Sequence, residues 1–444
     1  YRLDELVPIE NAAMPDRTVI QWDKDDIEAL GLMKVDVLGL GMLSCIRRAL
    51  ELVSAQLQKP FAMQNIGKED AAVYGMLCRG ESTGVFQVES RAQMNMLPRL
   101  KPVNYFDLVV QIAIVRPGPI QGGMVHPYLK RRQKIEAVSY PSEAVEGVLK
   151  RTLGIPIFQE QVMELSMVAA GFSADEADQL RRSMAAWKRK GGMGHLKHKL
   201  TEGMLKNGYK QEFIDSIYEQ IKGFGSYGFP ESHAASFALL AYDSAWLKLH
   251  FPAAFCCALL NSQPMGFYSA SQLIQDAVKN GVNVLPVDIN ASEWDCALVY
   301  DDTISRKRTR KKTWLRLGFR IVSGMGENVA NMIVVRRGPQ PFTDIRDVVQ
   351  RTGIDIKTVN ALTDADAFKV LVVIAFNRNG WPARRVLLIC HSRRAELTLH
   401  AHRSHPLPSA RKSSPISAAR DSHCACIHSS CCAGCSKAST VQTN

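Results

Sequence analysis

A lysine and an aspartate interrupt an apolar segment, GLMKVDVLGL, at residues 31–40. The short apolar run predicts a β-strand. Side chains two residues apart on a strand point to the same face, so Lys34 and Asp36 would project together. Charged groups on an apolar strand are costly unless they are paired or have a chemical use. Two interpretations remain open: a structural ion pair, or Asp36 as a Mg²⁺ ligand beside a phosphate-binding Lys34.

A cationic helix is the second candidate. Ser173 and Glu176 have the spacing of a capping box, which predicts a helix start. Arg181 and Lys188 lie seven residues apart and share a face of that helix, with Arg182 beside them. Apolar residues on the same helix predict that it is anchored to a core, and firmly held arginines suit bidentate contacts to phosphate. A solvated cationic face is the alternative.

A glycine-rich segment, GFGSYGFP at residues 223–230, contains Tyr227 and leads to Ser232 and His233. A long apolar helix is predicted from about 232 to 249. Glycines allow close backbone approach, and a helix N-terminus offers free N–H groups to an anion. The alternative is a plain helix start with a capping serine and a surface histidine.

A second glycine turn lies in LGFRIVSGMGENVANMIVVRR, residues 317–337. Its glycine-hydrophobic-glycine pattern between two elements is expected of half a helix-hairpin-helix. In that motif the backbone amides near Gly324 and Gly326 would meet a DNA phosphate, with Arg336 and Arg337 at the far end of the helix. Such contacts are independent of DNA sequence and sensitive to salt. The alternative is an ordinary glycine turn before a helix.

The segment after residue 369 differs in composition from the rest. It is rich in Ser, His, Arg and Cys, has few acidic residues, and shows no sustained period. Such a composition predicts disorder. Histidines and cysteines at 423–435 offer ligand types for Zn²⁺, but their spacing fits no standard zinc finger, which favours an incidental cysteine-rich sequence. The five earlier cysteines (Cys45, Cys78, Cys256, Cys257 and Cys296) are predicted to be reduced core residues.

The net charge of +12 is unevenly distributed over the 444 residues. From residue 370 onward ten Lys and Arg face two Asp and Glu, whereas residues 1–369 have 45 against 41. Overall charge is therefore poor support for DNA binding, and only local clusters can carry that argument. No run of about 18 uncharged apolar residues exists, so a membrane span is not expected. The first residues resemble no signal peptide, and a cytoplasmic location is expected.

The elements that would position these residues are mostly helical. Helices are predicted at about 43–56, 159–222 and 232–249, and short helices between glycine and proline turns at 68–130. A loop and strand region is predicted at 281–322, followed by a turn and helix at 323–337. The expected fold class is therefore mainly α with short β.

Several segments, in this order, closely resemble the bacterial C-family DNA polymerases, the polymerase III alpha subunit family. They are GLMKVDVLGLGML, ESTGVFQVESRAQM, IVRPGPIQGGMVHPYLKRR, GIPIFQEQVMEL, ADQLRRSMAAWK and YGFPESHAASFALLAYDSAWLKLHFPAAF. The stretch LVPIENAAMPDRTVIQWDKDD, together with the PESH and MAAWK motifs, is most similar to the error-prone branch. The resemblance covers residues 1–368.

The resemblance implies four regions. They are the end of a palm domain at 1–50, fingers at 51–262, the end of the fingers with a helix-hairpin-helix DNA-binding region at 263–368, and an aberrant, disordered tail at 369–444. It also implies roles for single residues, which are carried over by motif as follows: Asp36 as a metal-binding palm aspartate and Lys34 as its active-site neighbour; Arg181, Arg182, Lys188, Tyr227, Ser232 and His233 near the incoming nucleotide; Gly324 and Gly326 at DNA.

The implied activity is template-directed nucleotidyl transfer in translesion synthesis during DNA repair, with two Mg²⁺ ions. The implied partners are DNA primer-template, deoxynucleoside triphosphates, and accessory mutagenesis proteins or a sliding clamp, with no membrane. The family supplies two further aspartates from a P-D-x-D-x-D-like motif, which these 444 residues lack. The expectation is therefore a fragment that lacks most of the palm and is inactive alone, with a tail produced by a change of reading frame. A non-catalytic DNA-binding remnant and a Zn-binding protein are the alternatives.

Overall fold

The structure is a computed structural model that describes the main chain of residues 2–22, 24–32, 38–116, 119–120, 123–190, 194–224, 230–266, 268–300 and 313–371. The side chains of 184–190, which end a helix, are outside the described part. Residues 33–37 of the strand predicted at 31–40, Tyr227, and the tail from 372 onward also lie outside it. The predictions for Lys34, Asp36, Tyr227 and the tail therefore stay predictions.

Short elements come first in the chain. They are α1 (Leu3–Leu6), a hairpin of β1 (Ile9–Asn11) and β2 (Thr18–Ile20), and α2 (Lys24–Ala29). The hairpin is antiparallel, with Glu10 opposite Val19.

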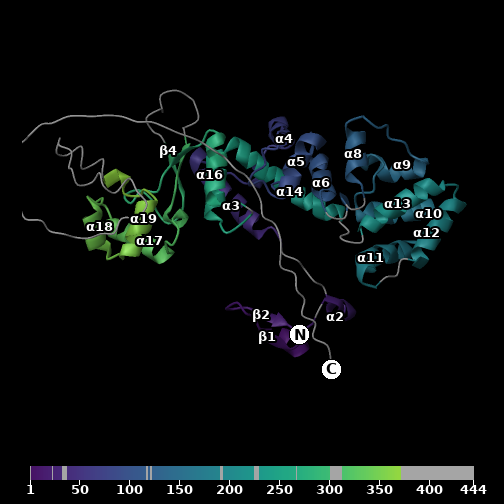
Figure 1. Ribbon diagram of the computed structural model, residues 1–444, viewed down its shortest axis with the longest axis horizontal. Helices are drawn as coiled ribbons and strands as arrows, with labels where there is room; N and C mark the ends of the chain where they lie inside the picture. Colours follow the sequence, from purple (N-terminus) through teal and green to yellow (C-terminus); the bar gives the residue numbers. More distant parts are fainter. Residues whose placement is uncertain are drawn as a thin grey trace, which may run out of the picture. The chain divides into compact units, whose positions relative to one another are not determined.

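Helices of the first large layer follow. They are α3 (Leu40–Leu57), η1 (Met63–Asn65), α4 (Ala71–Cys78), α5 (Arg91–Leu100), α6 (Tyr105–Ile114) and α8 (Val125–Arg132), and, later in the chain, α14 (Glu231–His250), α15 (Pro252–Asn261) and α16 (Ala270–Lys279). The chain between Asp243 and Lys248 is buried at every residue, so α14 is enclosed by its neighbours. It packs against α6, α15, α4 and α3. Of these helices, α3, α4 and α6 are labelled near α14 in Figure 1.

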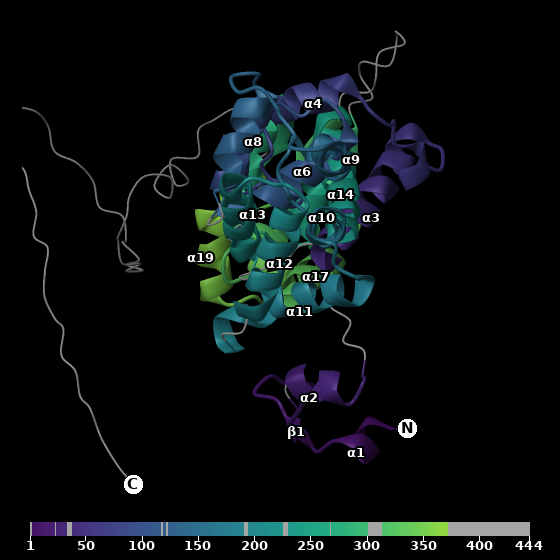
Figure 2. The same cartoon turned by 90° about the vertical axis from the view of Figure 1, so that its right-hand side faces the viewer.

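A group of helices between α8 and α14 forms a second layer. Its members are α9 (Glu143–Leu149), η2 (Lys150–Thr152), α10 (Gln159–Ala170), α11 (Ala174–Lys190), α12 (Gly194–Lys206) and α13 (Gln211–Phe224). α10 is central and contacts α9, α11 and α12 (Figure 2). A Cβ on Gly203 would lie 2.1 Å from the Ala170 carbonyl oxygen, so only glycine permits this approach of α12 to α10.

The last described part contains a small sheet and three helices. β3 (Asn283–Leu285) pairs in parallel with β5 (Thr313–Arg316), which pairs antiparallel with β4 (Ala297–Tyr300). After them come η4 (Phe319–Ile321), α17 (Glu327–Arg337), α18 (Ile345–Thr352) and α19 (Ile356–Asp364). These helices share a separate core that includes Phe319, Ile333, Phe342, Val348 and Leu362.

The predicted fold class, mainly α with short β, is confirmed. The helices predicted at 43–56 and 232–249 are α3 and α14, each somewhat longer than expected, and the predicted turn and helix at 323–337 contains α17. The five early cysteines are free thiols and four of them are buried, as predicted. Across the described residues, every helix is too short or too polar to cross a bilayer.

Candidate functional site

The start of α11 has the capping box that the sequence predicts. The Glu176 backbone N–H donates to Ser173 Oγ at 3.3 Å, and the Ser173 N–H donates to Glu176 Oε2 at 3.0 Å. Two reciprocal bonds satisfy donors that a helix N-terminus otherwise leaves free. A bond from Lys199 on α12 to the Glu176 carboxylate fastens the box to its neighbour helix.

Arg181 and Arg182 both reach back along α11 to one carboxylate, Asp178. Their Nε atoms donate to the two Asp178 oxygens at 2.8 and 2.7 Å. Hydrogen bonds from Arg181 first, and then from Arg182, lower the pKa of Asp178. The side chains are 40% and 66% exposed, so both guanidinium groups also face solvent. Two exposed guanidinium groups held by one carboxylate form a dense positive surface that suits a phosphate.

The first turn of α14 is fastened to the second layer by its backbone and by an ion pair. The Glu231 backbone N–H donates to Glu160 Oε2 of α10 at 3.0 Å, and Arg151 lies 2.7 Å from the Glu231 carboxylate. Ser232 follows in the same turn and is exposed. No side chain caps this helix start, as far as the described residues show. The capping serine of the alternative interpretation is therefore wrong, because Pro230 occupies the N-cap position and Ser232 lies inside the helix.

His233 is partly enclosed on the same turn. Its ring lies 4.1 Å, centroid to centroid, from the ring of Phe237, and burial followed by the charge of Arg116 lowers the pKa of His233. The Arg116 guanidinium is itself oriented by a bond from Nε to the Ile112 carbonyl at 3.2 Å. His233 is therefore favoured in its neutral form near Arg116, and it is not the plain surface histidine of the alternative interpretation.

The glycine turn before α17 is open to solvent. Gly324 has φ +78°, a left-handed conformation that favours glycine, and Gly326 is the uncapped N-cap of α17. A Cβ built on either residue meets nothing within 4 Å. The backbone at this helix start is thus accessible to an anion.

A second turn of this kind separates α18 from α19. Gly353 has φ +69°, its Cβ position is open, and the Asp355 side chain caps α19. Sequence reasoning missed this turn, although the Thr-Gly-Ile-Asp sequence before a helical pattern was a signal for it.

The arginines at the end of α17 have different roles. Arg337 donates to the carbonyls of Ile289 and Ser292 at 3.2 and 2.8 Å, so it joins α17 to the loop after β3. Arg336 is exposed. Both arginines lie in the last turn of α17, at the end away from the glycine turn, and the Arg337 guanidinium satisfies backbone carbonyls there.

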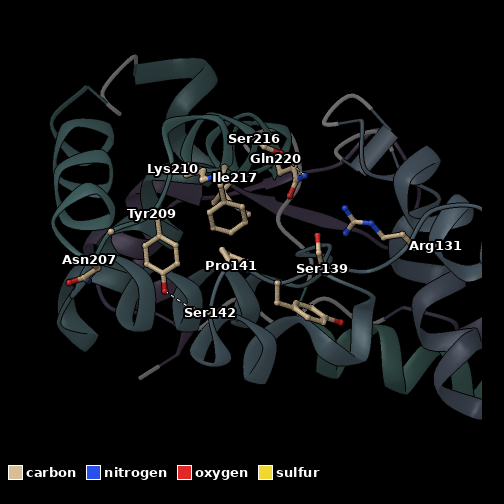
Figure 3. A pocket seen from close by; sticks show the side chains of 14 residues that line it. Arg131, Ser139, Pro141, Ser142, Asn207, Tyr209, Lys210, Ser216, Ile217 and Gln220 are labelled. Carbon is tan, nitrogen blue, oxygen red and sulfur yellow. Dashed lines mark hydrogen bonds between the residues drawn. The ribbon is translucent and has the colours of Figure 1, made fainter.

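A pocket of about 450 Å³ lies between the loop before α9 and the α12–α13 turn (Figure 3). The Tyr209 and Ser142 hydroxyls meet across one end at 2.8 Å. Arg131 at the opposite end is bonded to Glu136 and to the Leu153 carbonyl. None of the residues predicted to bind nucleotide or DNA lines this pocket, and its arginine already has acceptors.

A magnesium site requires oxygen ligands gathered at one point. Across the described residues, no group of three or more His, Cys, Asp and Glu side chains could hold a metal ion. Asp36, the predicted ligand, and Lys34 lie outside the described part, as does the Lys188 side chain.

The sequence matches three family models in chain order. Residues 1–39 match the bacterial DNA polymerase III alpha NTPase domain, residues 42–208 the bacterial DNA polymerase III alpha subunit finger domain, and residues 281–378 a helix-hairpin-helix motif. Proteins called error-prone DNA polymerase align with most of the chain. That of Methylococcus capsulatus is 60% identical over 376 residues, which are 82% of this chain and 36% of the relative.

Two further relatives carry the same name. That of Alkalilimnicola ehrlichii is 56% identical over 369 residues, covering 83% of this chain and 35% of the relative. That of Pseudomonas fluorescens strain Pf-5 is 56% identical over 375 residues, covering 83% of this chain and 36% of the relative. Finger and helix-hairpin-helix regions in this order define a DNA polymerase class. The chain belongs to the bacterial C-family DNA polymerases, the polymerase III alpha subunit family, in the error-prone branch. It spans about a third of the length of these relatives.

Proposed function

We infer that this chain supplies the fingers and the helix-hairpin-helix region of an error-prone DNA polymerase, which performs template-directed nucleotidyl transfer in translesion synthesis. The observation that supports this is the order of the matches: the end of the alpha NTPase domain, then the finger domain, then the helix-hairpin-helix motif. The proposed regions remain 1–50, 51–262 and 263–368, followed by the tail at 369–444. A cytoplasmic location and accessory partners such as a sliding clamp belong to the same proposal.

In this proposal α11 binds the incoming triphosphate. The guanidinium groups of Arg181 and Arg182 are exposed beside Asp178, so the donors that Asp178 leaves free can reach phosphate oxygens. Ser232 and His233 would contribute from the first turn of α14, with Lys188 and Tyr227 assigned by motif alone. The positive surface would stabilise charge on the phosphates, without a covalent intermediate.

Magnesium would supply activation of the primer hydroxyl and neutralisation of phosphate charge in the intact family site. Asp36 would contribute one carboxylate, with Lys34 beside it. Two metal ions need at least two bridging carboxylates, and the P-D-x-D-x-D-like motif is absent from these 444 residues. We therefore expect no nucleotide incorporation by this chain alone in a primer-extension assay with Mg²⁺. Incorporation that Asp36→Asn abolishes would contradict that expectation.

Nucleotide binding tests the assignment without needing catalysis. Calorimetric titration of the 444-residue chain with dATP and Mg²⁺ should show affinity about tenfold weaker in Arg181→Ala and in Arg182→Ala, since each loses charge-assisted bonds. Arg47→Ala is the matched control, because Arg47 is an exposed arginine paired with Glu51 on α3. Equal dATP affinity in all four proteins would overturn the role of α11.

Duplex DNA binding tests the glycine turn. The chain should bind fluorescent duplexes of unrelated sequence equally, with affinity that falls steeply as salt rises. Gly324→Ala should weaken binding to all of them, because alanine is strained at φ +78° and would shift the amides. Gly208→Ala is the matched control, since Gly208 is an equally open left-handed glycine at φ +79° in another turn. A non-catalytic DNA-binding protein remains the second candidate, favoured if DNA binds but dATP does not.

A further inference from the structure

A pocket of about 560 Å³ opens between α14 and the segments that precede α4 and α6. Three tyrosines line it, Tyr74 from α4, Tyr105 from α6 and Tyr242 from α14, together with Asp243. Its volume is in the range of small-molecule sites. None of the residues assigned to nucleotide or DNA lines it.

Asp243 is the unusual member of this lining. The residue is only 4% exposed, yet neither a hydrogen bond nor an ion pair to its carboxylate occurs within the described part of the chain. A buried carboxylate is ordinarily paired or hydrogen-bonded, because its desolvation is costly. The pocket contains a carboxylate without a partner.

The neighbouring tyrosines do not donate to the Asp243 carboxylate, because each hydroxyl donates to another acceptor. Their acceptors are Glu69 for Tyr74 at 2.9 Å, the Gly67 carbonyl for Tyr242 at 2.6 Å, and the Ala235 carbonyl for Tyr105. The hydroxyl of Tyr242 also accepts the backbone N–H of Asp70 at 2.8 Å. These bonds hold the three rings in place as walls and direct their polar ends away from Asp243.

Two other charged side chains line the pocket, Lys68 and Glu69. Lys68 is exposed, and its ammonium is more than 4.0 Å from the Asp243 carboxylate. Glu69 accepts the Tyr74 hydroxyl and also the Tyr105 backbone N–H at 3.2 Å, so its carboxylate is satisfied. Asp243 is therefore the buried carboxylate in this lining that accepts no hydrogen bond from a described residue.

Burial raises the pKa of Asp243 to about 6. The carboxyl is thus mostly ionised at neutral pH despite its enclosure, and its charge has no counter-ion among the lining groups described. A cation entering the pocket would remove that unfavourable state.

We propose that this pocket binds the ammonium or guanidinium group of an organic cation, with the Asp243 carboxylate as its counter-ion. The inference goes beyond the polymerase function and does not depend on it. The tyrosine rings favour such a ligand further, because aromatic faces attract cations and pack against an apolar stem. A bare inorganic cation fits less well, since the walls offer rings rather than several oxygen ligands.

The test uses small probes and the full 444-residue chain. Saturation-transfer NMR at pH 7.5 would compare n-butylammonium and n-butylguanidinium with n-butanol, a neutral molecule of similar shape. We expect both cations to bind and n-butanol to bind at least tenfold more weakly. Nα-acetyl-lysine amide and Nα-acetyl-arginine amide, which keep the charged side chain, distinguish two sources of the cation. Binding as tight as that of the free cations points to a protein side chain. Binding of the free cations alone points to a small amine.

Three variants locate the effect. Asp243→Asn keeps the shape and should weaken cation binding at least tenfold, whereas Glu212→Gln, the same change on the exposed face of α13, should leave it unchanged. Lys68→Met should bind the cations as the wild type does. A tenfold gain in Lys68→Met would mean that Lys68 occupies the pocket itself, and this would overturn the proposal.

Acidity provides an independent readout. The probe cations keep their charge between pH 5 and 8, whereas Asp243 titrates near pH 6. Binding should therefore weaken as pH falls through about 6 in the wild type and show no such change in Asp243→Asn. Failure of both cations to bind the wild type, or equal binding by Asp243→Asn, would sink the idea. Neither outcome affects the interpretation of the nucleotide-binding and DNA-binding tests, because those tests use other residues.

Discussion

Charged side chains are buried in the interior of α14 and exposed to solvent on the outer face of α11. On α14, Lys248 and Asp243 are both buried, with Lys248 paired to Asp276 and Asp243 unpaired among the described residues. On α11, Arg181 and Arg182 share Asp178 while remaining exposed. Water reaches the charges on α11, whereas the buried ammonium of Lys248 on α14 is supported by Asp276 and the Thr83 carbonyl. Charges on α14 should therefore affect stability more strongly than those on α11.

Breaking the buried pair on α14 should have the largest effect. The Lys248 ammonium donates to Asp276 Oδ2 at 2.6 Å and to the Thr83 carbonyl at 2.8 Å, and its side chain is 3% exposed. Lys248→Ala should lower the free energy of unfolding by roughly 3–5 kcal/mol, because it leaves a partly buried carboxylate unpaired beside a cavity. Urea unfolding would measure this.

The exposed pair of Arg47 and Glu51 supplies the control for that experiment. Its side chains are 63% and 60% exposed, so Arg47→Ala should cost less than about 0.5 kcal/mol. Similar costs for Lys248→Ala and Arg47→Ala would contradict the contrast between buried and exposed charges.

Removing the unpaired charge of Asp243 on α14 should raise the free energy of unfolding at neutral pH, whereas breaking the Lys248 pair lowers it. The pKa of Asp243 rises from 3.8 to about 6 on burial, so the folded state holds its proton more tightly than the unfolded chain. Stability is then unaffected below pH 4 and falls as pH rises toward 6, by about 3 kcal/mol in total. Asp243→Asn should escape this loss.

Chemical unfolding at several pH values measures that difference. Asp243→Asn should match the wild type near pH 4 and exceed it above pH 7. A variant less stable than the wild type at pH 8 would show that the carboxylate has a partner after all. Adding the cation probes should narrow the gap if the pocket binds them.

Local sequence patterns predicted the local structure of this chain. They could not predict electrostatic interactions between residues far apart in the sequence. The Ser173–Glu176 capping box was predictable because both partners lie within one turn. The isolation of Asp243 was not, because it depends on tyrosines from three helices donating elsewhere. The acceptors of Arg337 were not predictable for the same reason, since they are 45 and 48 residues away in the chain.

The helix-hairpin-helix region depends on a third arrangement, an arginine that binds backbone. Arg351 Nη2 donates to the carbonyls of Arg336 and Arg337 in the last turn of α17 and to that of Gln340 beyond it. Its guanidinium lies 4.4 Å from the Phe342 ring centre. These bonds satisfy carbonyls that a helix C-terminus leaves without partners.

Arg351→Ala should destabilise this region by about 1–3 kcal/mol, because it removes charge-assisted bonds. Hydrogen exchange should show faster exchange in α17 and α18 and unchanged protection in α14, since the two regions have separate cores. Arg351→Lys should recover only part of the protection, as an ammonium cannot reproduce the planar fork. Equal loosening of α14 would argue against separate cores.

The smallest effect on stability should come from α11, where ligand binding should change instead. Asp178 holds both guanidinium groups, so Asp178→Asn removes the shared negative charge and leaves two arginines in place. We expect no resolvable shift in the urea midpoint, because the pairs are exposed. If α11 meets triphosphate, dATP should bind the variant more tightly than the wild type, since no carboxylate competes for the arginines. Weaker dATP binding would instead mean that Asp178 is needed to orient Arg181 and Arg182, so the direction of change separates competition from positioning.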